Sequence, residues 1–174
     1  MIGQNAPTNP LQGFVDDLAK MRGRIADLER FLSRPAPRGI VGLTEATATA
    51  WTNATGTETD ITVSAGTAPQ LTLALSPARK YRAKFQGRFS GSVASDIIVR
   101  FYESGTARMA AVAAVPAAPA VTVFDEWVFT PASASSVVYK VMGALAAGAP
   151  AATISATASA ATPMQFWIED IGPA

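Results

Sequence analysis

The 174-residue chain contains neither cysteine nor histidine. Disulfides, thiolate nucleophiles, Cys or His zinc sites and a Ser-His-Asp triad are therefore excluded by inventory. The net charge is also small, because the 14 basic residues are nearly balanced by 13 acidic ones, which leaves +1. Bulk charge this small does not favour nucleic-acid binding. From these absences we expect no cofactor, no metal and no nucleic-acid partner.

The chain also lacks a convincing hydrophobic run. Residues 141–168 carry no charge, but they are mostly Ala, Ser, Thr and Gly and include Pro150 and Pro163, which is unfavourable for a membrane span. The opening "MIGQNAPTNP" has neither the basic nor the apolar region of a signal peptide. We therefore expect no membrane insertion and no signal peptide.

Paired acidic residues are the remaining candidates for catalysis. These are Asp16-Asp17, Asp125-Glu126 and Glu169-Asp170, and the last two fall in segments that alternate like strands, where neighbouring side chains point to opposite faces. Neither pair can then place two carboxyl groups across one bond, and no phosphate-binding or dinucleotide motif occurs. We predict that the protein is not an enzyme, with a glycosidase or lyase built from distant acids as the alternative.

Residues 11–32 carry apolar side chains at an unbroken 3-4 spacing, typical of a coiled coil. In a parallel coil Asp17 would face Arg22, and Arg24 would face Glu29, of a neighbouring chain; both pairs have opposite charge. The segment "RIADLE" also resembles the short motif that specifies trimers. The alternative is an amphipathic helix lying on the rest of the chain. The predicted trimerisation residues are Leu11, Phe14, Leu18, Met21, Arg24, Ile25, Leu28, Glu29 and Leu32.

Beyond residue 42 the apolar period changes from 3.5 to 2, which predicts about eight antiparallel strands in a jelly-roll-like β-sandwich. The segment 107–123 is rich in Ala and holds Pro116 and Pro119, so we expect a loop there. Much of the apolar content is alanine, which buries little area, so the core is expected to rest on the scattered Val, Ile, Leu, Phe, Tyr and Trp and to be supplemented by neighbouring chains. Trp51, Trp127 and Trp167 are expected in core or subunit contacts. The predicted organisation is a tail at 1–10, a coiled-coil helix at 11–33, a Pro/Gly linker at 34–42 and a β domain at 43–174. The predicted strands are 60–63, 71–75, 81–89, 96–102, 124–129, 136–142, 152–157 and 165–171.

A cluster of cations surrounds the clearest strand, "YRAKFQGRF", with no acidic residue among them. One interpretation is an edge or outer strand that uses Lys and Arg to block strand addition. The other is contact with an anionic partner, either a surface polymer or an acidic protein. The candidate contact residues are Arg79, Lys80, Arg82, Lys84 and Arg88.

Three segments, "RPAPRGIVGLTEATA", "RKYRAKFQGRFSGSVASDIIVRFYESGT" and "FWIEDIGPA", together resemble small virion-associated proteins of actinobacterial phages. These are minor tail, head-fibre or decoration proteins with an N-terminal coiled coil and a C-terminal β-sandwich, and the resemblance runs in order through residues 34–174. It implies a homotrimer on the virion surface, made in the host cytoplasm and attached to capsid or tail proteins through its N-terminal region. The alternative is the carbohydrate-binding head of a tail fibre, in which Tyr and Trp side chains line a shallow groove for a host cell-surface glycan.

Overall fold

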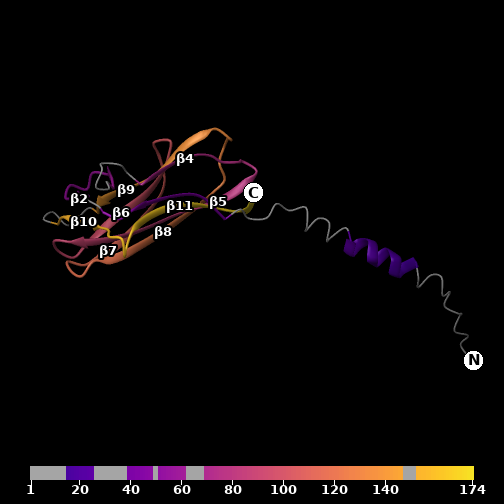
Figure 1. Ribbon diagram of the computed structural model, residues 1–174, viewed down its shortest axis with the longest axis horizontal. Helices are drawn as coiled ribbons and strands as arrows, with labels where there is room; N and C mark the ends of the chain where they lie inside the picture. The colour runs from indigo at the N-terminus through magenta and orange to yellow at the C-terminus, as the bar shows by residue number, and fades with distance from the viewer. Residues whose placement is uncertain (1–14, 26–38, 49–50, 62–68, 147–151) are drawn as a thin grey trace, which may run out of the picture. The chain divides into compact units, whose positions relative to one another are not determined.

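The computed structural model describes residues 15–25, 39–48, 51–61, 69–146 and 152–174 (Figure 1). The chain divides into two units, Met1–Ala36 and Pro37–Ala174. The first unit contributes one described helix, and the second is mainly β with antiparallel strand pairing throughout.

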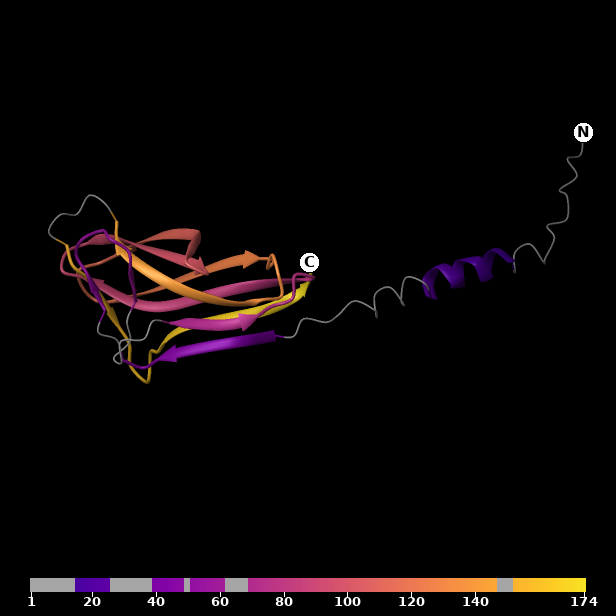
Figure 2. The same ribbon diagram turned by 90° about the horizontal axis from the view of Figure 1, so that it is seen from above.

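Six strands form the first sheet, with β5 at its centre. One edge of β5 pairs with β11 over its first half and with β10 over its last residues, while the other edge pairs with β8. Outside β11 lies β1, and outside β10 lies β2. In Figure 2 the indigo β1 and the yellow β11 run side by side. The strands are β1 (Gly39–Ala46), β2 (Thr52–Asn53), β5 (Arg79–Gly91), β8 (Val121–Phe129), β10 (Ile154–Thr157) and β11 (Met164–Pro173).

Five strands form the second sheet, in which β6 lies between β7 and β9. The free side of β9 pairs with β4 along its first residues and with β3 farther on. The strands are β3 (Thr59–Asp60), β4 (Gln70–Ala74), β6 (Ser95–Glu103), β7 (Thr106–Val115) and β9 (Ser136–Leu145).

One hydrophobic core lies between the inward faces of the two sheets. Aromatic contacts join them directly: the Phe101 ring on β6 lies 6.3 Å from Phe166 on β11, and Phe129 on β8 lies 5.3 Å from Tyr139 on β9. The largest fully buried side chains are Tyr, Phe, Ile, Met and Val, so large residues and not alanines fill the centre. The core thus rests on large apolar residues, as expected. The alanines buried among them are Ala46, Ala83, Ala144, Ala152 and Ala156.

The prediction of a loop at residues 107–123 was wrong. Its first part belongs to β7 and its last residues begin β8, while Pro116 and Pro119 fall in the turn between them. The hydrogen bonds that β6 offers along β7 outweigh the weak strand preference of alanine. A further strand, β1, begins at Gly39 inside the segment expected to be a linker.

The other predicted strands, apart from 60–63, correspond to β4, β5, β6, β8, β9, β10 and β11. Of 60–63, Asp60 ends β3, and residues 62–63 lie outside the described residues. Trp51 lies in the core and Trp127 packs against it, but Trp167 faces outward on β11.

Residues 15–25 form the described helix, within the segment predicted as a coiled coil. Every residue of this helix is exposed, including Leu18, Met21 and Ile25. The tail 1–10 and the predicted trimerisation residues Leu11, Phe14, Leu28, Glu29 and Leu32 lie outside the described residues. Within the described ranges, no helix has the length and apolar character needed to cross a bilayer.

Candidate functional site: the outer face of the first sheet

The side of the first sheet that points away from the core carries an ordered set of side chains. Strand alternation aims every second residue of β11, β5 and β8 outward, and β1 follows the same pattern apart from a register shift between Ile40 and Gly42. The pairing registers align these residues in rows across the sheet. We call these twelve residues the outer face: Glu45, Gln165, Gln86 and Phe124 in the first row; Leu43, Trp167, Lys84 and Glu126 in the second; Ile40, Glu169, Arg82 and Val128 in the third.

The outer face exposes more apolar surface than an ordinary solvated sheet requires. Ile40, Leu43, Phe124 and Val128 are 58%, 50%, 53% and 50% exposed. Clusters of exposed apolar side chains, flanked by polar ones, mark interaction surfaces more often than isolated exposed residues do. This arrangement favours the outer face as a contact surface.

Acids on the neighbouring strands balance the cations of β5. Lys84 Nζ lies 3.0 Å from Glu169 Oε1, and Arg82 Nε lies 3.8 Å from Glu126 Oε2. Burial by itself would raise the pKa of Glu169, but the hydrogen bonds from Trp167 and Lys84 outweigh it and lower that pKa. The basic stripe seen in the sequence is thus largely neutralised across the sheet.

The five predicted anionic-partner residues do not share one environment. Lys80 is exposed, Arg82 and Lys84 face acids, and Arg88 Nε donates to the carbonyl oxygen of Ala120 at 3.3 Å. Arg79 is only 5% exposed. The edge-strand interpretation is wrong, because β5 is paired along both edges.

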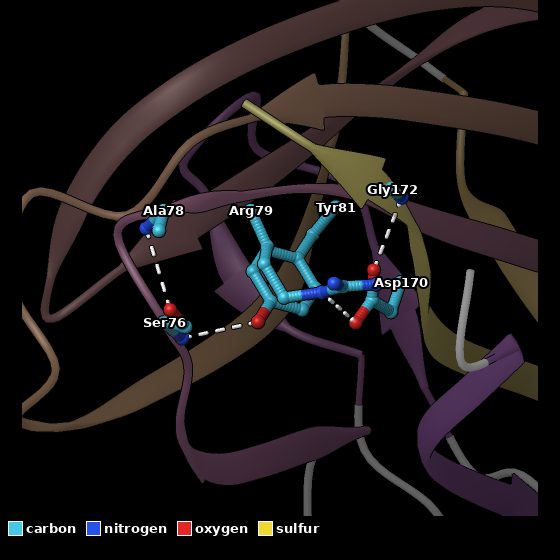
Figure 3. Close-up of polar contacts among 6 residues, drawn as sticks. All are labelled: Ser76, Ala78, Arg79, Tyr81, Asp170 and Gly172. Carbon is cyan, nitrogen blue, oxygen red and sulfur yellow. Dashed lines mark hydrogen bonds and ion pairs between the residues drawn. The ribbon is translucent and has the colours of Figure 1, made fainter. Parts of the chain in front are cut away.

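Arg79 instead joins the start of β5 to the last residues of β11 (Figure 3). Its Nε lies 2.5 Å from Asp170 Oδ2, and both side chains are almost completely buried. Asp170 Oδ1 accepts the backbone N–H of Gly172, while Tyr81 accepts the N–H of Ser76 through its hydroxyl oxygen. The hydrogen bond to Asp170 raises the pKa of Arg79. This cluster fixes the turn before β5 against the end of β11.

The outward pairing of Phe124 with Trp167 was not predicted from the sequence. The rings of Phe124 and Trp167 lie 6.2 Å apart at an interplanar angle of 56°. Trp167 Nε1 donates to Glu169 at 3.0 Å, and Lys84 Nζ lies 5.7 Å from the indole centroid, within cation–π range. A usable signal was present, because Phe166 and Ile168 read as core residues and Trp167 between them must then point outward.

Asp125 points inward from β8, opposite Phe85. Its Oδ1 accepts the N–H of Glu126 at 2.9 Å, whereas Oδ2 is buried without a hydrogen-bond partner in the described part of the chain. Burial raises the pKa of Asp125 above its ordinary value. An inward charge on an outermost strand is a known device against pairing with other sheets.

The two acidic pairs occupy the geometry that strand alternation predicts. Glu169 faces outward and Asp170 is buried, just as Glu126 faces outward and Asp125 inward. Neither pair converges on a common point, so neither forms a catalytic dyad.

Comparison of the chain with protein-family models and with curated protein sequences found no match.

Removing the charge of Asp170 tests the buried ion pair. Asp170→Asn leaves the Arg79 cation without its carboxylate in the interior, so the midpoint of thermal unfolding should fall. Replacing both partners with apolar residues (Arg79→Met with Asp170→Leu) should recover part of the loss. The control, Glu126→Gln, removes an exposed partner of Arg82 and should change the midpoint little. Equal effects of Asp170→Asn and Glu126→Gln would contradict the assigned role.

Because the pKa of Asp125 is raised in the folded protein, we expect the free energy of unfolding to depend on pH. The contribution of Asp125 is most favourable below the unfolded pKa of about 3.9 and is lost as pH rises through the folded pKa. Asp125→Asn should therefore raise the free energy of unfolding by about 1 kcal/mol at pH 7, and the gain should shrink towards pH 4. Urea titrations at both pH values measure this, with the exposed Asp96→Asn as control. A gain that is the same at both pH values would exclude the burial of charge as its cause.

Proposed function

We propose that the protein is a non-enzymatic bacteriophage virion protein that assembles as a homotrimer through its N-terminal region. It acts as a surface fibre or decoration protein of the head, or as a minor tail protein, by adhesion or reinforcement. The β unit forms a jelly-roll-like sandwich displayed at the virion surface. The exposed apolar stripe of the N-terminal helix is the observation that carries this proposal.

That stripe is evident in the described helix. Leu18, Met21 and Ile25 are 36%, 50% and 54% exposed and occupy consecutive a, d and a positions of the heptad register. An apolar stripe of this width matches a coiled-coil seam more closely than the broader face of a helix packed on a domain. Partner helices would remove these side chains from water, with a gain of roughly 1.5–3 kcal/mol for each fully buried large apolar side chain.

Charges beside the stripe favour other copies of the same chain as the partner. In the single chain Asp17 lies 3.6 Å from Lys20, an exposed pair that contributes little. In a parallel coil Asp17 would also face Arg22 of the next chain, and Arg24 would face Glu29. The trimer is preferred to the dimer because "RIADLE" resembles a trimer-specifying motif.

The arrangement of the strands supports a sandwich. The chain passes from the first sheet to the second between β5 and β6, returns between β7 and β8, and crosses again between β8 and β9. Repeated crossings between two antiparallel sheets are typical of sandwich and jelly-roll proteins. The virion assignment rests on the resemblance of residues 34–174 to phage structural proteins, and the non-catalytic role is supported by the diverging acidic pairs.

Sedimentation equilibrium tests the trimer directly. The full chain should have three times the monomer mass at micromolar concentration, and Leu18→Asn should shift it towards monomer because it places an amide in the seam. The matched control is Ala19→Asn, one residue away at an outward b position, which should remain trimeric. Circular dichroism should show the same β content in both variants. A monomeric wild-type protein would overturn the proposal.

Attachment to the particle requires a separate test. A protein without residues 1–32 should still fold its β unit, since the core described above lies within residues 37–174, yet should be missing from purified virions. Cryo-electron microscopy of particles assembled with full-length and truncated protein would measure occupancy and locate the protein on head or tail. Normal incorporation of the truncated protein would assign attachment to the β unit.

A further inference from the structure

The first sheet contains a hollow where β5 changes its partner. Along one edge β11 pairs with β5 as far as Gln86, and β10 takes over at Arg88, so Gly87 lies at the break between them. The connection from β10 to β11 turns away from the sheet here and supplies Ala161, Thr162 and Pro163 to the wall. The hollow has a volume of about 130 Å³ and opens beside the first row of the outer face.

Polar groups of complementary kinds line this hollow. Two primary amides, one guanidinium and two hydroxyls converge on it: Gln86, Gln165, Arg88, Thr122 and Thr162. Amides and hydroxyls each both donate and accept hydrogen bonds. In the described part of the chain, the Gln86 amide and the Thr122 hydroxyl make no side-chain hydrogen bond. Their donors and acceptors are therefore available to a ligand.

An aromatic surface adjoins the hollow directly. Phe124 is the ladder partner of Gln86, and Trp167 follows Gln165 by two residues on the same side of β11. Their rings lie 6.2 Å apart, at positions of the sheet directly beside the polar side chains that line the hollow. A ligand that reaches out of the hollow would thus lie across Phe124, which is 53% exposed, towards Trp167.

The polar lining and the adjoining aromatic pair together favour some classes of ligand over others. A polyanion would need several uncompensated cations, but Arg88 is the only cation in the lining, and Arg82 and Lys84 face acids. A purely apolar ligand would leave the Gln86 amide and the Thr122 hydroxyl without partners. A sugar ring has hydroxyls on its rim and C–H groups on its faces, so it can satisfy the amides while it packs on an aromatic ring.

We propose that the hollow and the adjoining Phe124–Trp167 pair form a binding site for a neutral glycan. One pyranose ring occupies the hollow against Gln86, Thr122 and Gln165, and a second ring packs on Phe124. The volume of about 130 Å³ is below the usual range for drug-sized ligands, which fits one ring in the hollow and the rest on the open surface. The site lies within a single chain and therefore does not depend on trimer formation.

A neutral-glycan array probed with the full-length protein identifies the sugar, and isothermal titration calorimetry with the corresponding oligosaccharide measures affinity and stoichiometry. We expect one site per chain and a change in tryptophan fluorescence, because Trp167 lies at the site. Gln86→Ala and Phe124→Ala should each weaken binding by about tenfold or more. Val112→Ala, an exposed change on β7 of the second sheet, should leave affinity unchanged.

Two results would overturn this assignment. One is the absence of binding to every neutral glycan of the array by a wild-type protein that is folded by circular dichroism. The other is saccharide binding that neither Gln86→Ala nor Phe124→Ala weakens. Preferential binding to acidic glycans, lost on Arg88→Gln, would identify the basic side chain as the determinant and exclude the neutral class.

Discussion

The pairing of β5 along both of its edges is the constraint on which the rest of the β unit depends. Thirteen residues alternate between core and surface without interruption, so one face of this strand supplies Phe85 and Phe89 to the core. The other face supplies the central column of the outer face. A shift of one residue in register would exchange the two sets and bury Arg82 and Lys84, which makes the register energetically unambiguous.

Electrostatics on the outer face follow from the same register. Acids from β8 and β11 come beside the cations of β5 only because these strands flank it on opposite sides. In the sequence Glu126 and Glu169 are distant from the basic stripe, so the stripe read as an uncompensated charge. The exposed pairs stabilise the fold little, but they leave the cations of β5 compensated on this face, which removes the main reason to expect an anionic partner there.

Local pattern was sufficient for much of the fold and insufficient for the hollow. Period-two alternation located most of the longer strands, because each buries one face. It failed for β7, because alanine occupies both faces of this strand and leaves little difference in hydrophobicity between them. The pairing with β6 decides the conformation instead. The hollow could not be predicted at all, since it arises where β10 replaces β11 beside Gly87, a consequence of long-range pairing that no local pattern encodes.

The composition of the core changes how assembly is understood. From the abundance of alanine, neighbouring chains had seemed necessary to complete the interior. The interior holds Phe, Tyr, Ile, Val and Met contributed by one chain, with some alanines buried among them, while others such as Ala110 and Ala114 lie on the exposed side of β7. The β unit therefore does not need subunit contacts to fill its core. The apolar residues exposed on the helix lie in the other unit of the chain, so the filling of the core and the apolar stripe of the helix belong to separate parts of the sequence.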